Sequence, residues 1–232
     1  MQSSPNLARV ASLIGDPSRI AMLLCLIGGK ALPASELARA AKITPQTASS
    51  HLAKLVEGGL LTQEAYGRHR YYQLANAEVA HALEALQAIA SPQPVRSLRE
   101  SDRVKKLHFA RTCYDHLAGK IGVALTDRLV ERGFIRAEGK DFLLTAEGQE
   151  NLKAFGVEVE PRKGGRHFAR QCLDWSERRP HLAGSLGASL TRRLFELGWI
   201  ERFPDGRVVR LTAAGTKGLS DQFGLRVEEV ST

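Results

Sequence analysis

The strongest constraint on the fold of this 232-residue chain is an internal duplication in its second half. A series of motifs recurs there in the same order, and roughly half of about fifty aligned positions are identical. The paired segments are 108–115 with 167–174, 116–119 with 181–184, 125–129 with 190–194, 133–135 with 198–200, 144–148 with 211–215, and 155–156 with 223–224. The second half therefore contains two copies of one structural unit.

Each copy predicts the same local structure. Leucines at helical spacing precede a glycine, Gly133 or Gly198, that suits the end of a helix. Two extended runs joined by a tight turn follow, at 134–137 with 141–144 and at 199–203 with 207–211. Thr145 and Thr212 are suitable N-caps for a closing helix. A helix, a hairpin and a closing helix predict a winged-helix-like repeat.

Prolines Pro92 and Pro94 interrupt the chain after a helical run and predict a boundary. We expect a DNA-binding and dimerisation domain at 1–92, a linker at 93–104, repeat 1 at 105–161, and repeat 2, a potential effector-sensing region, at 162–232. The predicted fold class is mainly α with small β-hairpin wings (α+β): a winged helix-turn-helix followed by two tandem winged-helix-like repeats.

Residues 6–90 predict the helix-turn-helix. Two short helices, at 35–41 and 46–57, are joined by a tight turn in which Thr44 is an N-cap and Pro45 opens the second helix. Strands are expected at 60–64 and 70–74, with a basic tip between them. A polar helix followed by a basic wing is typical of a module that binds duplex DNA.

The net charge of +8 and the pI of about 9.7 suit such a polyanionic partner. Ala48, Leu52 and Leu55 are expected to face the core, which leaves the polar face of the same helix for base edges. The predicted DNA contacts are Thr44, Gln46, Thr47, Ser49, Ser50, His51 and Lys54 on the helix, and Arg68, His69 and Arg70 on the wing.

Several motifs of residues 6–90 resemble the ArsR/SmtB family. They are Leu13–Arg19, Glu36–Ala38, Ser49–Leu55, Gly58–Leu61 and the wing Gly67–Tyr72. The resemblance implies a homodimer formed through residues 6–14 and 78–90, and repression that is relieved when an effector binds. Such a dimer is expected to place two recognition helices one helical turn apart, on a palindromic operator.

The metal sites of that family do not carry over to this chain. The helix at 35–41 contains no cysteine, and the run 78–90 offers only His81 and two glutamates. Cys25 lies in an apolar helix, where we expect a buried structural thiol. The signal is therefore expected to act on the duplicated region, which short members of the family lack.

The two repeats carry the candidate effector residues Cys113, Asp115, His116, Cys172, Asp174, Trp175 and His181. Four interpretations stay open: a thiolate and imidazole metal site, a redox-active cysteine pair, a pocket for a small organic effector between the repeats, and residues that only serve packing. No cofactor is expected to be required, and the metal is unknown.

Two other classes of function are alternatives to a transcriptional regulator. A Cys- or His-dependent enzyme lacks support, because no nucleophile elbow, phosphate loop or metalloprotease signature is present. A winged helix that binds proteins instead of DNA is the main alternative. Because catalytic signatures are missing, we expect that the protein is not an enzyme. The chain contains no apolar run of the roughly 18 residues that a membrane span needs, so we expect a cytoplasmic protein.

Overall fold

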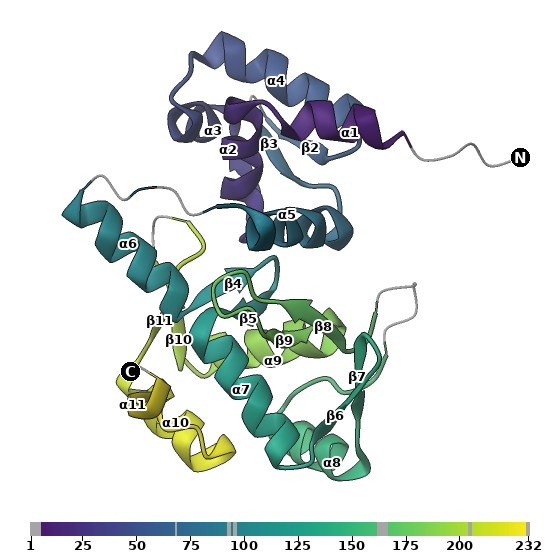
Figure 1. Cartoon of the computed structure of the whole chain (residues 1–232), viewed down its shortest axis with the longest axis vertical. Helices are drawn as coiled ribbons and strands as arrows, with labels where there is room; N and C mark the ends of the chain where they lie inside the picture. Colours follow the sequence, from purple (N-terminus) through teal and green to yellow (C-terminus); the bar gives the residue numbers. More distant parts are fainter. Residues whose placement is uncertain are drawn as a thin grey trace, which may run out of the picture. The chain divides into compact units, whose positions relative to one another are not determined.

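The computed structural model describes residues 6–67, 69–91, 94, 97–161, 167–203 and 206–230. The chain divides into two units, Met1–Leu83 and Glu84–Thr232, whose elements are labelled in Figure 1. Among the described residues, no helix is both long enough and apolar enough to cross a membrane.

The N-terminal unit is a winged helix-turn-helix, as predicted. Its elements are α1 (Leu7–Ile14), α2 (Pro17–Leu26), β1 (Leu32–Pro33), α3 (Ala34–Ala41), α4 (Pro45–Glu57), β2 (Leu61–Tyr66) and β3 (His69–Leu74). The strands form an antiparallel sheet in the order β1-β3-β2. Helix α5 (Ala77–Ile89) begins in this unit. The core takes Leu23 and Ile27 from α2 and its C-cap, Leu37 from α3, and Leu52 and Leu55 from α4.

The C-terminal unit begins with α6 (Leu98–Phe109), which occupies part of the segment predicted as a linker. Copy 1 then contains β4 (Arg111–Cys113), β5 (His116–Ala118), α7 (Gly119–Glu131), β6 (Ile135–Glu138), β7 (Asp141–Leu144) and α8 (Ala146–Ala154). Copy 2 contains β8 (Arg170–Leu173), β9 (Pro180–Ala183), α9 (Gly184–Glu196), β10 (Ile200–Arg202), β11 (Val209–Leu211) and α10 (Ala213–Phe223), followed by α11 (Val227–Val230).

The predicted helix, hairpin and closing helix are present in both copies. Each copy also has another hairpin ahead of its main helix, β4-β5 in copy 1 and β8-β9 in copy 2, which was not predicted. We call this hairpin the first hairpin of its copy. These two hairpins contain the candidate effector cysteines and histidines.

The two copies interlock through their strands. A four-stranded sheet in the order β6-β7-β8-β9 joins the wing of copy 1 to the first hairpin of copy 2. The matching junction joins the first hairpin of copy 1 to the wing of copy 2, where the Thr112 amide donates to the Arg207 carbonyl at 2.8 Å. Each hairpin is therefore completed by the other copy.

A pair of threonines repeats this exchange between the main helices. Thr126 on α7 accepts a hydrogen bond from the amide of Leu182 on β9, and Thr191 on α9 accepts one from the amide of Leu117 on β5, both at 2.9 Å. Such reciprocity is what a two-fold interface between identical subunits produces. One core serves both copies, with Ile121, Leu125 and Leu129 from α7 and Leu186, Leu190 and Leu194 from α9.

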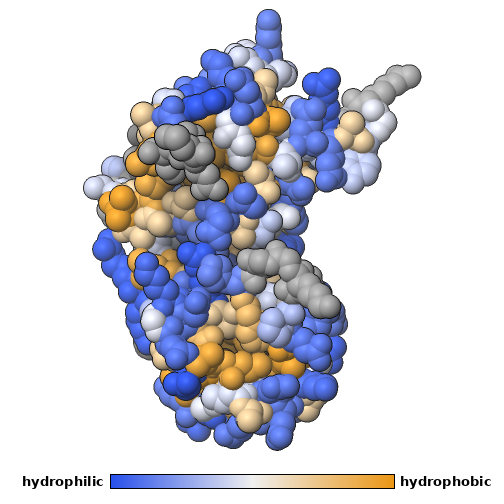
Figure 2. All heavy atoms as spheres, turned by 90° about the vertical axis from the view of Figure 1, so that its right-hand side faces the viewer, coloured by the Kyte–Doolittle hydropathy of each residue, from blue (hydrophilic) through white to orange (hydrophobic). Residues whose placement is uncertain are grey.

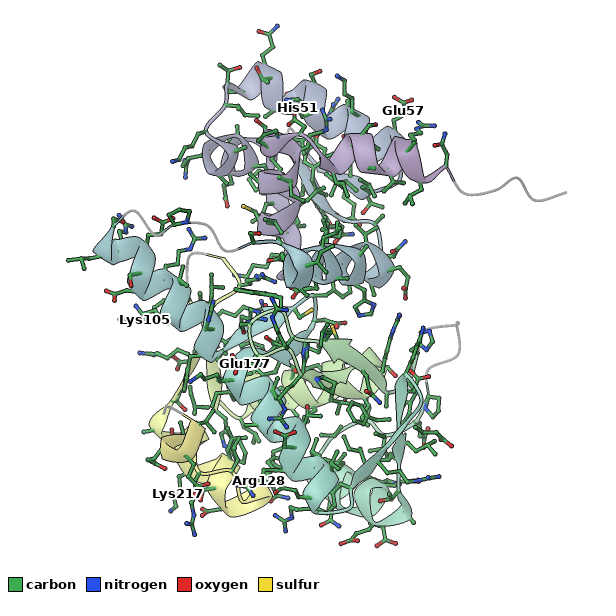
Figure 3. The ribbon with its side chains drawn as sticks, viewed as in Figure 1. His51, Glu57, Lys105, Arg128, Glu177 and Lys217 are labelled. Carbon is green, nitrogen blue, oxygen red and sulfur yellow. The ribbon has the colours of Figure 1, made fainter. Side chains whose placement is uncertain are left out.

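A buried ion pair also links the copies. Arg111 on β4 and Asp174 after β8 are both fully buried, and an Arg111 guanidinium nitrogen donates to Asp174 Oδ1 at 2.8 Å. The same oxygen accepts from Ser176 and from the amide of Glu177, which Figure 3 labels. The other carboxylate oxygen accepts from the Gly119 amide at 2.7 Å. This dense set of donors satisfies a charge that would otherwise be costly to bury.

The same contacts determine the protonation state of Asp174. Burial by itself raises the pKa of Asp174, but the Arg111 guanidinium, the neighbouring His181 and the Ser176 and Gly119 donors outweigh burial. Together they hold the pKa of Asp174 well below its usual value. Asp174 is therefore a carboxylate at neutral pH.

Replacing Arg111 by methionine tests the importance of this pair. Arg111→Met leaves a buried carboxylate without its cation, so we expect the free energy of unfolding to fall by about 3–5 kcal/mol. Arg179→Met is the matched control, because the Arg179–Asp127 pair is exposed on the arginine side and should be worth less than about 1 kcal/mol. Urea unfolding followed by circular dichroism measures both. Equal losses in the two variants would contradict a special role for Arg111.

Candidate functional site

The first candidate site is the exposed face of α4. The turn before it contains Lys42 in the left-handed conformation, with φ 55°, and Thr44 caps the helix by accepting from the Thr47 amide. Ala48, Leu52 and Leu55 are completely buried, as predicted. This fixes the rotation of α4 and leaves the opposite face in solvent, with Gln46, Thr47, Ser49, Ser50 and Lys54 all exposed.

His51 differs from the other predicted contacts on this helix. Its side chain is half-buried, and Nδ1 lies 3.2 Å from a guanidinium nitrogen of Arg19 on α2. Figure 3 shows His51 along the middle of α4. The geometry assigns this residue to holding the helix in place.

Arg19 is a residue that positions helices. In the sequence it was identified only as part of a family motif. Its guanidinium donates to the carbonyl oxygens of Ser12 and Leu13 at 2.8 and 2.7 Å. Asp16 caps α2 by accepting from the amides of Ser18 and Arg19, and the bond from Arg19 is the main cause that lowers the pKa of Asp16. The Asp-Pro-Ser-Arg sequence therefore fixes α1, α2 and α4 relative to one another.

The wing is the β2-β3 hairpin. Gly67 has φ 59°, which suits its turn, and Arg70 on β3 is exposed. Two predicted contacts, Arg68 and the side chain of His69, lie outside the described residues. Among the predicted wing contacts, Arg70 is the one whose side chain the structure describes.

A groove of about 420 Å³ connects the helices to the wing. Its lining includes Ser35 from the first turn of α3, Ser49 from α4, and Gln63 and Arg70 from the wing. Pro33 is the N-cap residue of α3, and its side chain has no acceptor that could cap the first turn of this helix. Short polar side chains and a guanidinium therefore share one concave surface.

The second candidate site is a buried cluster in the C-terminal unit. Cys113, His116, Cys172 and His181 each offer a ligand atom, and these four atoms lie within 4.8 Å of one another. The exposed fractions of these residues are 0, 1, 7 and 0% in chain order. Four of the predicted effector residues, two from each copy, therefore meet at one point.

Strand register explains how the four residues meet. Cys113 pairs with His116 across β4-β5, and Cys172 pairs with His181 across β8-β9. The loop between the paired residues is longer in copy 2, but the extra residues leave the register unchanged. Each hairpin thus presents one cysteine and one histidine side by side.

The two predicted aspartates flank the cluster. Asp115 Oδ1 lies 3.4 Å from Nδ1 of His116, and Asp174 Oδ2 lies 3.7 Å from Nδ1 of His181. The hydrogen bond with Cys172 and burial raise the pKa of the Cys113 thiol well above its usual value. In the structure as described, Cys113 is therefore a neutral thiol.

Trp175 contacts Arg111, whose guanidinium carbon lies over the ring at 4.4 Å from its centre. The cavity between α7 and α9, lined by residues of both copies, measures about 10 Å³. That volume holds at most one water molecule. An organic effector has no room there. Cys25, the remaining cysteine, is half-buried in the N-terminal unit.

Comparison with known proteins relates this chain to bacterial regulators. A helix-turn-helix domain family matches residues 14–64. The chain is 46% identical over 225 residues to the uncharacterized HTH-type transcriptional regulator YdfF of Bacillus subtilis (strain 168), covering 97% of this chain and 100% of that protein. The HTH-type transcriptional regulator CmtR of Mycobacterium tuberculosis (strain ATCC 25618 / H37Rv) is 33% identical over 92 residues, 38% of this chain and 77% of CmtR.

Among solved structures, the homodimeric winged helix-turn-helix domain of a possible ArsR-family regulator from Mycobacterium bovis is 25% identical. It covers 38% of this chain and 89% of that domain, with a TM-score of 0.33. The match to YdfF includes the duplicated C-terminal region as well as the helix-turn-helix. The chain belongs to the family of HTH-type transcriptional regulators, and its N-terminal unit is the DNA-binding winged helix-turn-helix of this family.

Proposed function

We propose that this regulator is a repressor that binds a palindromic operator as a homodimer and is released when a signal acts on its C-terminal unit. It acts through binding alone, without a catalytic step. The observation that carries the proposal is the polar, exposed face of α4 opposite three completely buried residues. A helix fixed in this way can enter a major groove with its short side chains against base edges.

The side chains divide into two roles by their chemistry. Gln46, Ser49 and Ser50 are short donors and acceptors that suit base edges. Lys54 and Arg70 carry positive charge and suit phosphates. The groove between α3, α4 and the wing brings a phosphate near Arg70 when α4 lies in the major groove.

Exposed apolar residues support the homodimer. Every residue of α1 is at least partly exposed, and Leu7 is 76% exposed although it belongs to the apolar stripe of an amphipathic helix. On α5, Leu86 and Ile89 are 39 and 81% exposed. Figure 2 shows hydrophobic side chains at the surface of the molecule among hydrophilic neighbours. A dimer that covers these residues would place two copies of α4 one helical turn of DNA apart.

The DNA contacts predict two different effects on operator binding. Arg70→Ala removes one phosphate contact, so the affinity should fall for all DNA sequences. The slope of log K against log salt concentration should become shallower by about one unit. Gln46→Ala should change the preferred base at one position of each half-site, with a discrimination of about 1–3 kcal/mol. Fluorescence anisotropy with the DNA upstream of the protein's own gene and with mutated half-sites measures both.

The matched control is Arg210→Ala, which removes an exposed arginine from the C-terminal unit and should leave binding unchanged. Equal losses on all sequences for Arg70→Ala and Gln46→Ala would contradict the assignment of α4 as the recognition helix. Failure of the wild type to prefer any sequence would overturn the proposed function.

The dimer predicts a separate result. Leu7→Glu places a charge in the predicted interface and should shift the protein towards monomer at concentrations where the wild type is dimeric. Leu173→Glu is the control, because Leu173 is also exposed, at 49%, but lies on β8 of the C-terminal unit. Sedimentation equilibrium measures the dissociation constant of the dimer, which should increase in Leu7→Glu. The affinity for the operator should fall as the dimer dissociates more readily. An unchanged constant for Leu7→Glu would exclude α1 from the interface.

A further inference from the structure

We propose that Cys113, His116, Cys172 and His181 bind one zinc ion, which crosslinks the two copies of the C-terminal unit. Two sulfur and two imidazole ligands form a tetrahedral set that suits Zn²⁺. Neither copy contains the full set, so the site exists only when the hairpins β4-β5 and β8-β9 lie together.

The distances between like atoms fit a tetrahedral ion. A zinc ion with bonds of about 2.3 Å to sulfur and 2.0–2.1 Å to nitrogen separates its two sulfurs by about 3.8 Å and its two nitrogens by about 3.3 Å. The two Sγ atoms lie 3.9 Å apart, and the two Nε2 atoms lie 3.2 Å apart. The four atoms lie within 4.8 Å of one another, so closing the shell needs shifts of only about an ångström.

The surroundings of the histidines match those of metal ligands. The two rings turn their Nε2 atoms towards each other and place Nδ1 beside an aspartate, Asp115 in copy 1 and Asp174 in copy 2. A carboxylate behind a ligating histidine fixes the orientation of the ring and increases the basicity of the ligand. The arrangement occurs twice, once in each copy.

Charge and burial indicate a closed, structural site. Two thiolates would neutralise the charge of the ion, and both histidines bind it as neutral imidazoles, so the filled cluster carries no net charge into the protein interior. Four protein ligands leave no open coordination position, as in structural zinc sites. Binding then contributes directly to the stability of the C-terminal unit.

The experiment uses the full chain, purified under reducing conditions. Zinc content is measured by inductively coupled plasma mass spectrometry, and Co²⁺ is added to the metal-free protein as a spectroscopic probe. We expect one zinc per chain and the intense visible absorption of tetrahedral cobalt, with a sulfur-to-cobalt charge-transfer band. Zinc content and the cobalt spectrum are measured without DNA. A failure of the zinc proposal can therefore be distinguished from a failure of the proposed function.

Three variants test the ligands. Cys113→Ser should lose stoichiometric zinc and the charge-transfer band, whereas the matched control Cys25→Ser should retain both, because Cys25 lies in the N-terminal unit. Asp115→Asn keeps all four ligands and alters a partly exposed residue, so it should fold and bind zinc about 10–100-fold more weakly in competition with a chromophoric chelator. Circular dichroism verifies that each variant is folded.

Three results would overturn the proposal. The first is no zinc uptake by the reduced wild type at equimolar metal. The second is equal loss of zinc from Cys25→Ser and Cys113→Ser. The third is an octahedral cobalt spectrum, which would show that the cluster does not hold the ion. The purified protein could contain a Cys113–Cys172 disulfide and take up no metal after this disulfide is reduced. That result would assign the pair to redox chemistry instead.

Discussion

The C-terminal unit depends on a reciprocal exchange between its two copies. Thr126 and Thr191 each satisfy a buried backbone amide on the hairpin of the other copy, and each first hairpin is extended by the wing of the other copy. A buried amide without an acceptor costs roughly 1–3 kcal/mol, so neither copy is complete alone. The duplication is therefore a dimer interface within one chain, and the cysteine–histidine cluster lies where the two hairpins meet.

This exchange explains why the sequence identified the cluster residues but not their arrangement. Within one copy, a cysteine and a histidine make half of a ligand set, and the second copy has a different spacing between them. Strand pairing removes that difference, because the extra residues of copy 2 form a loop while Cys172 remains opposite His181. The sequence predicted the residues and the duplication, but the strand register that brings the two copies together is a tertiary property.

The N-terminal unit was more predictable because local signals specify it. The N-cap Thr44 with Pro45, the spacing of Ala48, Leu52 and Leu55, and the hairpin all have local physical causes. The role of His51 was not predictable in the same way, since its contact with Arg19 joins residues 32 positions apart. Hairpins β4-β5 and β8-β9 were missed because their strands are short and contain arginine, cysteine and histidine, which carry little strand signal.

The two copies are alike in fold but have diverged around the cluster. Arg111 and Asp174 form a completely buried pair, whereas their counterparts Arg170 and Asp115 are only partly buried. The copy 2 histidine therefore rests on a carboxylate held by many donors, and the copy 1 histidine rests on one that is 32% exposed. A carboxylate that is partly exposed to solvent moves more readily than one that is completely buried. The Asp115 side of the cluster is therefore the side nearer to solvent, whereas the protein interior encloses the Arg111–Asp174 side.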